Sequence, residues 1–344
     1  MSAITSLLGV ELPLVQAPMA GVQDEALALA VSEAGGLGSM PCALLGPAQL
    51  QVALQKFAAH PRPINLNFFC HAMAAPDPVE ARRWLHTLAP YYQEFGIEPP
   101  APSQAGARRP IDAATVDLLA PFRPQVVSFH FGLPEAPLLA RIKAWGAVVL
   151  ASATTLAEGL WLQRHGVDAV IAQGIEAGGH RGHFLADDLI GQPSTLDLVT
   201  ALCRNLTVPV IAAGGVGSRS DVLALLAAGA AAVQAGSAYL LCPEATTTAV
   251  HRAALQQSRR DTAITNLFSG RPARGLVNRL MRDLGALSAL PPAFPWAAQA
   301  LAPLRAAAEA RGLDDFTPLW SGTRPGGFPA MAAADVTRQL AGQG

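Results

Sequence analysis

Lysine is almost absent from this chain. Its 24 basic residues include only two lysines, Lys56 and Lys143, and both fall in segments that are expected to be helical. An aldolase that works through a Schiff base needs a lysine amine at its active site. Because neither lysine is expected near the carboxyl end of a strand, this class of enzyme is excluded.

Cysteine is scarce, and the four cysteines are far apart with no Cys-x-x-Cys pair among them. This spacing argues against a zinc or redox motif and agrees with a reducing cytoplasm. Glu176, His180 and His183 form the only dense group of residue types that bind metals, and they share one loop. A metal-dependent hydrolase needs ligands from several strand ends, so we predict no metal site.

Charge is also sparse, at 14% of residues with a formal net charge of −1, whereas 51% of residues are hydrophobic. This balance indicates a well-buried folded protein and gives no sign of a nucleic-acid or anionic-membrane partner. The N-terminus lacks a basic region followed by an apolar one, so we expect no signal peptide and a cytoplasmic location. The uncharged run 222–243 is long enough to span a bilayer, but its glycine and glutamine residues divide it into a helix and a strand.

Short apolar runs recur along the first part of the chain, and a segment of helix-forming residues follows each of them. Strands are expected at 14–19, 37–40, 63–69, 125–131, 147–151, 167–171, 208–215 and 232–237. Most of these runs lack the alternation of polar and apolar residues, as parallel strands buried on both faces do. Eight such units predict an α/β fold, a (β/α)8 TIM barrel.

The barrel is predicted to occupy residues 1–242, with an inserted segment at about 70–110. The insertion holds a helix at 78–95 and a Pro/Ala/Gly-rich loop at 99–110. Loops of this length are usually lids, binding loops or disordered. Residues 243–344 are predicted to form a mostly helical cap or substrate domain, with the tail packing back on the barrel.

Small and polar residues gather where the predicted strands end, and in a barrel these ends meet at one mouth. They are Met19, Asn67, Ser128, His130, Gln173, Gly178, Gly179, His180, Gly214, Gly215, Gln234, Ala235, Gly236 and Ser237. Gly214 and Gly215 lead into a helix N-terminus, and Gly236 and Ser237 end the neighbouring strand. Backbone N–H groups and a positive helix end predict a phosphate seat, as at strands 7 and 8 of many barrels.

The mouth offers more than a phosphate seat. The amides of Asn67 and Gln173 can bond the edge of a polar ring, and Met19 provides an apolar floor. FMN would use the phosphate seat, the amides and the apolar floor, whereas a phosphorylated sugar would use only the phosphate seat. The stretch 215–220 lacks the full G-x-G-x-x-G spacing and follows the seventh strand, so it does not indicate a Rossmann site.

His130 is the candidate for proton chemistry because it ends a buried strand and should reach the mouth. An imidazole, with an ordinary pKa of about 6.5, can take or hold a proton at cellular pH. The alternative is a core histidine bonded to backbone. His180 and Ser128 are candidate substrate contacts, although His180 could instead orient the glycine turn or contact phosphate. His183 is expected at the surface.

Five separated motifs carry a family resemblance: 16–21, 128–134, 172–182, 213–216 and, near the C-terminus, 268–275. They read QAPMAG, SFHFGLP, AQGIEAGGHRG, AGGV and FSGRPARG. Together they resemble class I of the nitronate monooxygenases, formerly called 2-nitropropane dioxygenases. The resemblance implies an FMN-bound TIM barrel that oxidises alkyl nitronates, notably propionate 3-nitronate, with O2. A carbonyl product and nitrite result, and the reaction is a detoxification.

The resemblance also implies roles for particular residues. FMN would contact Met19, Asn67, Gln173, Gly178, Gly215 and residues 234–237, and the active-site histidine would be His130. This histidine would orient the anionic nitronate or remove the α-proton of a neutral nitroalkane. Two positions depart from the family pattern. Ser237 replaces the more usual threonine but keeps the hydroxyl, and His183 replaces a small hydroxyl residue, which affects the expected substrate preference.

Two alternatives to nitronate oxidation remain open. An FMN-dependent NAD(P)H:quinone or enoyl reductase would share the glycine loop at 173–182 but differ in the His130 motif. A flavin-binding protein without turnover would hold FMN and show neither activity. The expected partners are a small nitronate and O2, without nucleic acid or membrane, in a monomer or homodimer.

Overall fold

Eight parallel strands form a ring at the centre of this computed structural model, which describes residues 2–101, 108–257, 260–325 and 328–343. Their order is β1-β9-β8-β6-β5-β4-β3-β2. The strands are β1 (Leu14–Gln16), β2 (Gly38–Pro41), β3 (Ile64–Phe69), β4 (Val126–His130), β5 (Val148–Ala153), β6 (Ala169–Gln173), β8 (Val210–Ala213) and β9 (Ala232–Ala235). A parallel bridge between Val15 and Leu37 joins the two ends of this order. The sheet therefore closes into a barrel.

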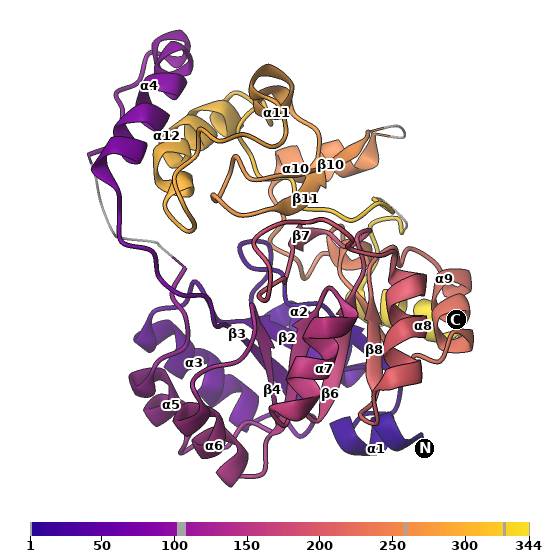
Figure 1. The fold of residues 1–344 in the computed structure, drawn as a ribbon. Coiled ribbons are helices and arrows are strands. Elements are labelled where there is room, and N and C mark those ends of the chain that lie inside the picture. Colours follow the sequence, from indigo (N-terminus) through magenta and orange to yellow (C-terminus); the bar gives the residue numbers. More distant parts are fainter. Residues whose placement is uncertain (1, 102–107, 258–259, 326–327, 344) are drawn as a thin grey trace.

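Helices follow the strands and cover the outside of the barrel (Figure 1). They are α2 (Glu25–Glu33), α3 (Pro47–Ala58), α5 (Ala113–Leu119), α6 (Ala136–Ala144), α7 (Leu156–Arg164), α8 (Thr195–Asn205) and α9 (Arg219–Ala227). Each overlaps a segment predicted to be helical, and the (β/α)8 prediction is confirmed. The uncharged run 222–243 is divided between α9 and β9, and no helix in the described ranges is long and apolar enough to cross a membrane.

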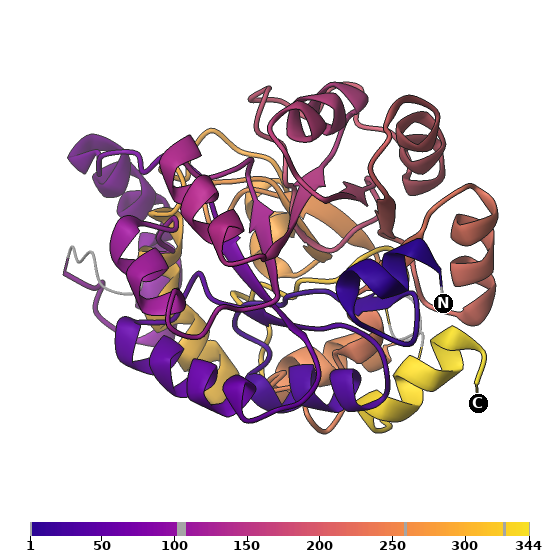
Figure 2. The ribbon, with the colours of Figure 1, turned by 90° about the horizontal axis from the view of Figure 1, so that it is seen from below.

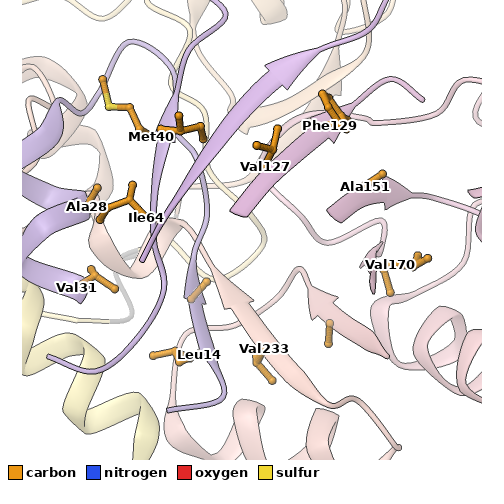
Figure 3. Packing of buried hydrophobic residues seen from close by; sticks show 14 of the residues in the cluster. Leu14, Ala28, Val31, Met40, Ile64, Val127, Phe129, Ala151, Val170 and Val233 are labelled. Carbon is orange, nitrogen blue, oxygen red and sulfur yellow. The ribbon is translucent and has the colours of Figure 1, made fainter. Parts of the chain in front are cut away.

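Strand side chains alternate between two apolar cores. Outward-facing residues such as Val127 and Val170 pack against the surrounding helices (Figure 3). Inward-facing residues such as Leu150 and Ile211 fill the barrel together with apolar residues of α1 (Ala3–Leu8), which lies at its lower end (Figure 2). Because both faces of most strands are apolar, most of the runs show no alternation of polar and apolar residues; β3, with Asn65 and Asn67, is an exception. The short α1 was not predicted.

A cap stands above the mouth of the barrel (Figure 1). Its elements are α10 (Ala249–Gln256), α11 (Arg279–Leu284) and α12 (Ala297–Ala310), with a small antiparallel sheet of β10 (Thr262–Thr265), β11 (Ala273–Leu276) and β7 (Gly179–His180). Strand β7 comes from the loop after β6, so this sheet joins the barrel mouth to the cap. A mostly helical cap was expected, and the strands are too short to be recognised in the sequence.

Helix α4 (Pro78–Phe95), from the inserted segment, packs on α12 of the cap. Asp77 caps its N-terminus, and Gly96 ends it in a left-handed conformation, with φ of 64°. Trp84 Nε1 donates to the carbonyl of Ala297 at 3.1 Å. The buried face of the helix consists of Trp84, Leu88, Tyr91, Tyr92 and Phe95. Of the predicted loop at 99–110, residues 102–107 lie outside the described residues.

The last helix, α13 (Ala333–Ala341), lies against the barrel and contacts α2 and α9. Val336 and Leu340 are fully buried in the outer core, and Thr337 Oγ1 lies 3.0 Å from the hydroxyl of Tyr239. The segment between α12 and α13 passes the barrel mouth on its way. This path places residues 320–324 beside the predicted phosphate seat.

Candidate active site

A cavity at the carboxyl ends of the barrel strands brings together most of the predicted site residues. Those that line it are Met19, Asn67, His130, Gln173, Gly178, Gly179, His180, Gly214, Gly215, Gln234, Gly236 and Ser237. Ala235 and Ser128 do not line it. Ala235 is buried in the outer core, and Ser128 Oγ lies 3.0 Å from Asn67 Nδ2, which donates to it. Ser128 therefore supports Asn67 from beneath.

The glycine seat lies at the N-terminus of α9. Gly214 and Gly215 have φ values of 126° and 70°, in the region that favours glycine. On the neighbouring strand end, Ser237 Oγ accepts a hydrogen bond from the backbone N–H of Gly322 at 2.8 Å. Arg324 also lines the cavity, and its guanidinium lies 3.6 Å from Asp221 at the start of α9. The segment before α13 thus completes the seat.

Gln173 holds the loop that follows β6. Its Nε2 donates to the carbonyl of His180 at 2.9 Å, and its Oε1 accepts from the backbone N–H of Gly182 at 2.7 Å. Both ends of this amide are therefore engaged within the protein. In contrast, Oε1 of Gln234 is buried and has no hydrogen-bond partner among the described residues.

Arg181 fixes the same loop from the inside. Its side chain is fully buried and donates to the carbonyls of Gly174 and Gln173 at 2.6 and 2.8 Å, and to Gln192 Oε1 at 2.9 Å. Burial lowers the pKa of its guanidinium to about 10, so it remains charged at neutral pH. The arginine of the glycine loop therefore shapes the cavity wall without lining the cavity.

His130 is held at both ring nitrogens. Nε2 lies 3.1 Å from the carbonyl of His180, and Nδ1 lies 3.1 Å from Ser152 Oγ. A carbonyl oxygen only accepts hydrogen bonds, so we assign the proton to Nε2, and Nδ1 then accepts from the serine hydroxyl. Burial lowers the pKa of His130 to about 3, which keeps the ring neutral. The ring lines the cavity and also bonds to backbone, so it combines both sequence interpretations.

His180 lies between the barrel and the cap. Its Nε2 is 2.9 Å from Ser269 Oγ, and its ring centroid is 5.5 Å from those of Phe294 and Trp320. Burial lowers its pKa well below the ordinary value. The ring is therefore a neutral polar group in an aromatic chamber, of which the cap supplies the roof.

The surface position expected for His183 is wrong. The residue is only 4% exposed, and its backbone carbonyl accepts a hydrogen bond from the Arg271 guanidinium. Burial lowers the pKa of its imidazole to about 4. The cap segment that carries Arg271 covers this histidine, and such a long-range contact leaves no local pattern in the sequence.

The residues considered for a metal site or a Schiff base make contacts that stabilise the fold. Glu176 accepts from the N–H and Oγ1 of Thr195 at 2.8 and 2.7 Å, at the start of α8. Within the described ranges, no three His, Cys, Asp or Glu side chains are grouped as a metal site. The two lysines lie on the outer helices α3 and α6, where Lys143 pairs with Asp168 at 3.0 Å.

Several cavity residues were not identified from the sequence. They include Phe69, Arg108, Ser152, Trp320, Ser321, Gly322 and Arg324. Arg108 comes from the Pro/Ala/Gly-rich loop, and four others come from the segment before α13. The only signal in that segment is a stretch of small residues around an arginine, which has the composition of an ordinary loop.

Comparison with known proteins agrees with this geometry. The family model for nitronate monooxygenase matches residues 1–334. A nitronate monooxygenase of Pseudomonas aeruginosa is 41% identical over 98% of this chain and 97% of its own length. A second, of Paraburkholderia phytofirmans, is 40% identical over 98% of this chain and 93% of its own.

Among solved structures, the nitroalkane oxidase of Streptomyces ansochromogenes superimposes with a TM-score of 0.88. It is 34% identical, and the match covers 99% of this chain and 97% of that one. The barrel and the cap therefore occur together in a related protein of known structure. From the family match and the two relatives, the chain belongs to the nitronate monooxygenase family and is an oxidoreductase enzyme.

Proposed function

We propose that the cavity binds FMN and that the protein oxidises alkyl nitronates, such as propionate 3-nitronate, with O2 to a carbonyl product and nitrite. The observation that carries this proposal is one cavity with a glycine seat at one end and two neutral imidazoles at the other. The four cysteines are free, which supports a reducing compartment, and we propose the cytoplasm. The proposed assembly is a monomer or homodimer.

The residues present fit a flavin mononucleotide. Gly214 and Gly215 line the cavity at positive φ, just before α9, and the N-terminus of a helix is a favourable place for a phosphate. A side chain at Gly178 would collide with backbone, since its Cβ would lie 2.4 Å from the nitrogen of Gly322. Oε1 of Gln234 is buried without a hydrogen-bond partner among the described residues, and an N–H donor on the flavin ring would supply the missing bond.

The proposed contacts with FMN follow from where each residue lies along the cavity. Gly215, Gly236 and Ser237 would hold the phosphate with backbone N–H groups and one hydroxyl. Asn67, Met19 and Gln234 would lie along the ring system. Gln173, Gly178 and Gly179 would form the wall beside it, because the Gln173 amide is already committed to the loop.

FMN, when bound, supplies the redox chemistry that couples nitronate oxidation to O2. The protein binds and orients the nitronate and excludes water. His130 keeps its proton on Nε2 and holds the carbonyl of His180, which positions the His180 ring between Phe294 and Trp320. Substrate would enter this chamber, with His130 and His180 as its polar wall.

The two imidazoles favour a nitronate that is already ionised. With a pKa of about 3, His130 is a weak base, and burial also holds the pKa of His180 low. A general base works best when its pKa lies near the operating pH. Removal of the α-proton from a neutral nitroalkane should therefore be slow, whereas a preformed nitronate needs no such step.

Anaerobic titration of the purified protein tests the function. We expect a yellow protein whose flavin is reduced by propionate 3-nitronate and only slowly by NADH, with nitrite formed after O2 is admitted. Rapid bleaching by NADH without any response to nitronate would instead assign a reductase. Bound FMN with no response to either compound would assign a flavin-binding protein.

A further inference from the structure

The cavity is positively charged at both ends. Of the described residues that line it, only Arg108 and Arg324 carry a formal charge at neutral pH, and no carboxylate is among them. Arg324 lies at the glycine seat, beside Ser321 and Gly322. Arg108 lies across the ring: the nearby Pro110 forms a bridge with Phe69 at the end of β3, opposite β8, and Arg108 is close enough to His71 and His180 to act on their pKa values.

The two arginines differ in their surroundings. The Arg324 guanidinium is 64% exposed and has Asp221 as a partner at 3.6 Å. Nε of Arg108 is shielded from solvent and has no hydrogen-bond partner among the described residues. Burial lowers the pKa of Arg108 to about 10, so the group still carries its charge at neutral pH.

The groups that face Arg108 are cationic or neutral. Burial lowers the pKa of both His180 and His71, so the two rings are neutral, and the positive charges of Arg108 and Arg271 lower the pKa of His180 further. The charged side chain that acts on Arg108 itself is another arginine, Arg305. A buried charge without a counter-ion is unfavourable, and proteins normally pair it. The phosphate of the proposed cofactor would lie at the Arg324 end, which leaves Arg108 for a second anion.

We propose that Arg108 is the counter-ion of the substrate and makes the enzyme select nitronate anions over neutral nitroalkanes. The inference rests on the proposed function for the identity of that anion. The guanidinium fork matches the two oxygens of a planar nitronate, as it matches a carboxylate. Arg108 is thus a specificity-determining residue, and it would bind nitronate together with the polar wall of His130 and His180.

Binding of nitrate tests the site without turnover. Nitrate is planar and anionic like a nitronate group, and calorimetric titration of the protein as purified gives its Kd. Arg108→Gln is expected to weaken nitrate binding by about 10-fold or more, since it removes a charge-assisted hydrogen bond. Arg109→Gln is the matched control, because this neighbouring arginine is exposed and does not line the cavity. Its nitrate affinity should equal that of the native protein.

Selectivity is measured as the ratio of kcat/KM for ethyl nitronate to kcat/KM for nitroethane. Arg108→Gln is expected to lower this ratio by about 10-fold or more, chiefly through KM for the nitronate. Arg108→Lys keeps the positive charge and should keep most of the selectivity ratio and of the nitrate affinity. If the glutamine variant folds poorly, the lysine variant still tests whether the charge is needed.

Three results would overturn the inference: an unchanged Kd for nitrate in Arg108→Gln, an unchanged ratio, or equal losses in the lysine and glutamine variants. Failure of the proposed function looks different. A native protein that binds nitrate through Arg108 but oxidises no nitronate would leave the anion site in place and remove the assigned reaction.

Discussion

The backbone carbonyl of His180 accepts two hydrogen bonds, from His130 Nε2 at 3.1 Å and from Gln173 Nε2 at 2.9 Å. Two barrel strands, β4 and β6, therefore fix one point of the loop that carries His180. The imidazole of His180 extends from this point toward the cap. Changes at His130 should thus alter the geometry of the chamber more than the retention of a cofactor at the far end.

Replacing His130 tests this relationship. His130→Asn is expected to retain yellow FMN and to lose most turnover, about 100-fold or more in kcat/KM, because asparagine cannot bridge Ser152 and the His180 carbonyl. Flavin absorbance and nitrite release measure the two effects. His165→Asn, on the exposed end of α7, is the control and should behave as native. Unchanged nitronate oxidation in His130→Asn would show that His130 is not needed to position the His180 loop for catalysis.

The glycine seat can be blocked by a side chain. Gly215→Val is expected to yield protein without flavin, because a branched residue is strained at φ of 70° and would occupy the seat. Gly312→Val is a matched control, since Gly312 follows α12 with a similar φ of 73° and a Cβ there would meet no atom within 4 Å. Flavin content per protein is measured for both. Full occupancy in Gly215→Val would place the phosphate elsewhere.

The hydroxyl of Ser237 links the seat to the segment before α13. Ser237→Ala removes the acceptor for Gly322 N–H and one proposed phosphate contact, and we expect the Kd for FMN to rise by about 10-fold. Ser237→Thr keeps the hydroxyl and should bind FMN within a few-fold of the native protein. Fluorescence titration of the apoprotein with FMN gives both constants. Equal constants for alanine and threonine would contradict the contact.

The cap depends on α4 for much of its core. Trp84→Ala removes a fully buried indole and its hydrogen bond to Ala297, so it should lower the free energy of unfolding by roughly 3–5 kcal/mol. Val79→Ala lies on the same helix at 64% exposure and should change stability by less than about 0.5 kcal/mol. Urea denaturation followed by fluorescence and circular dichroism provides the values. Similar stabilities for the two variants would argue against the packing of α4 on α12.

Buried neutral histidines make stability depend on pH. His251 is 2% exposed, and burial lowers its pKa to about 4 in the folded protein, against about 6.5 when unfolded. Above the unfolded value both states are neutral. As pH falls from about 6.5 to about 4, the unfolded chain binds a proton that the folded one does not, so stability falls by up to about 1.4 kcal/mol per pH unit.

Thermal denaturation at several pH values in this window measures the slope. His251→Asn should flatten it by about one proton, while the other buried histidines continue to contribute. A slope that is the same in the variant and the native protein would show that His251 already titrates normally in the folded state.

The barrel was predictable from the sequence because its signals are local. Strand ends such as Asn67, Gln173 and Gln234 follow apolar runs, and the regular alternation with helices gives the topology. The resulting convergence at one mouth follows from barrel geometry alone. For the same reason most of the candidate site residues line one cavity.

The remaining residues were missed because long-range packing decides their positions. Arg108 and Trp320 reach the cavity from irregular segments, whose periodicity carries no information. His183 is buried by Arg271 from the cap, and Gln173 is committed to its own loop. Ser128 was expected to contact substrate, but the structure places its hydroxyl beneath Asn67.

The hydrogen bond between Ser237 and Gly322 spans 85 residues of chain. During synthesis, the ribosome therefore releases all eight barrel strands well before the seat has its last wall. A nascent barrel has to wait for the cap to be translated and for the final helix to dock. If the cavity binds FMN as proposed, loading would be a late event in maturation. A chain that stopped shortly before Trp320 would lack both the last wall of the seat and α13, whose Val336 and Leu340 are buried against the barrel.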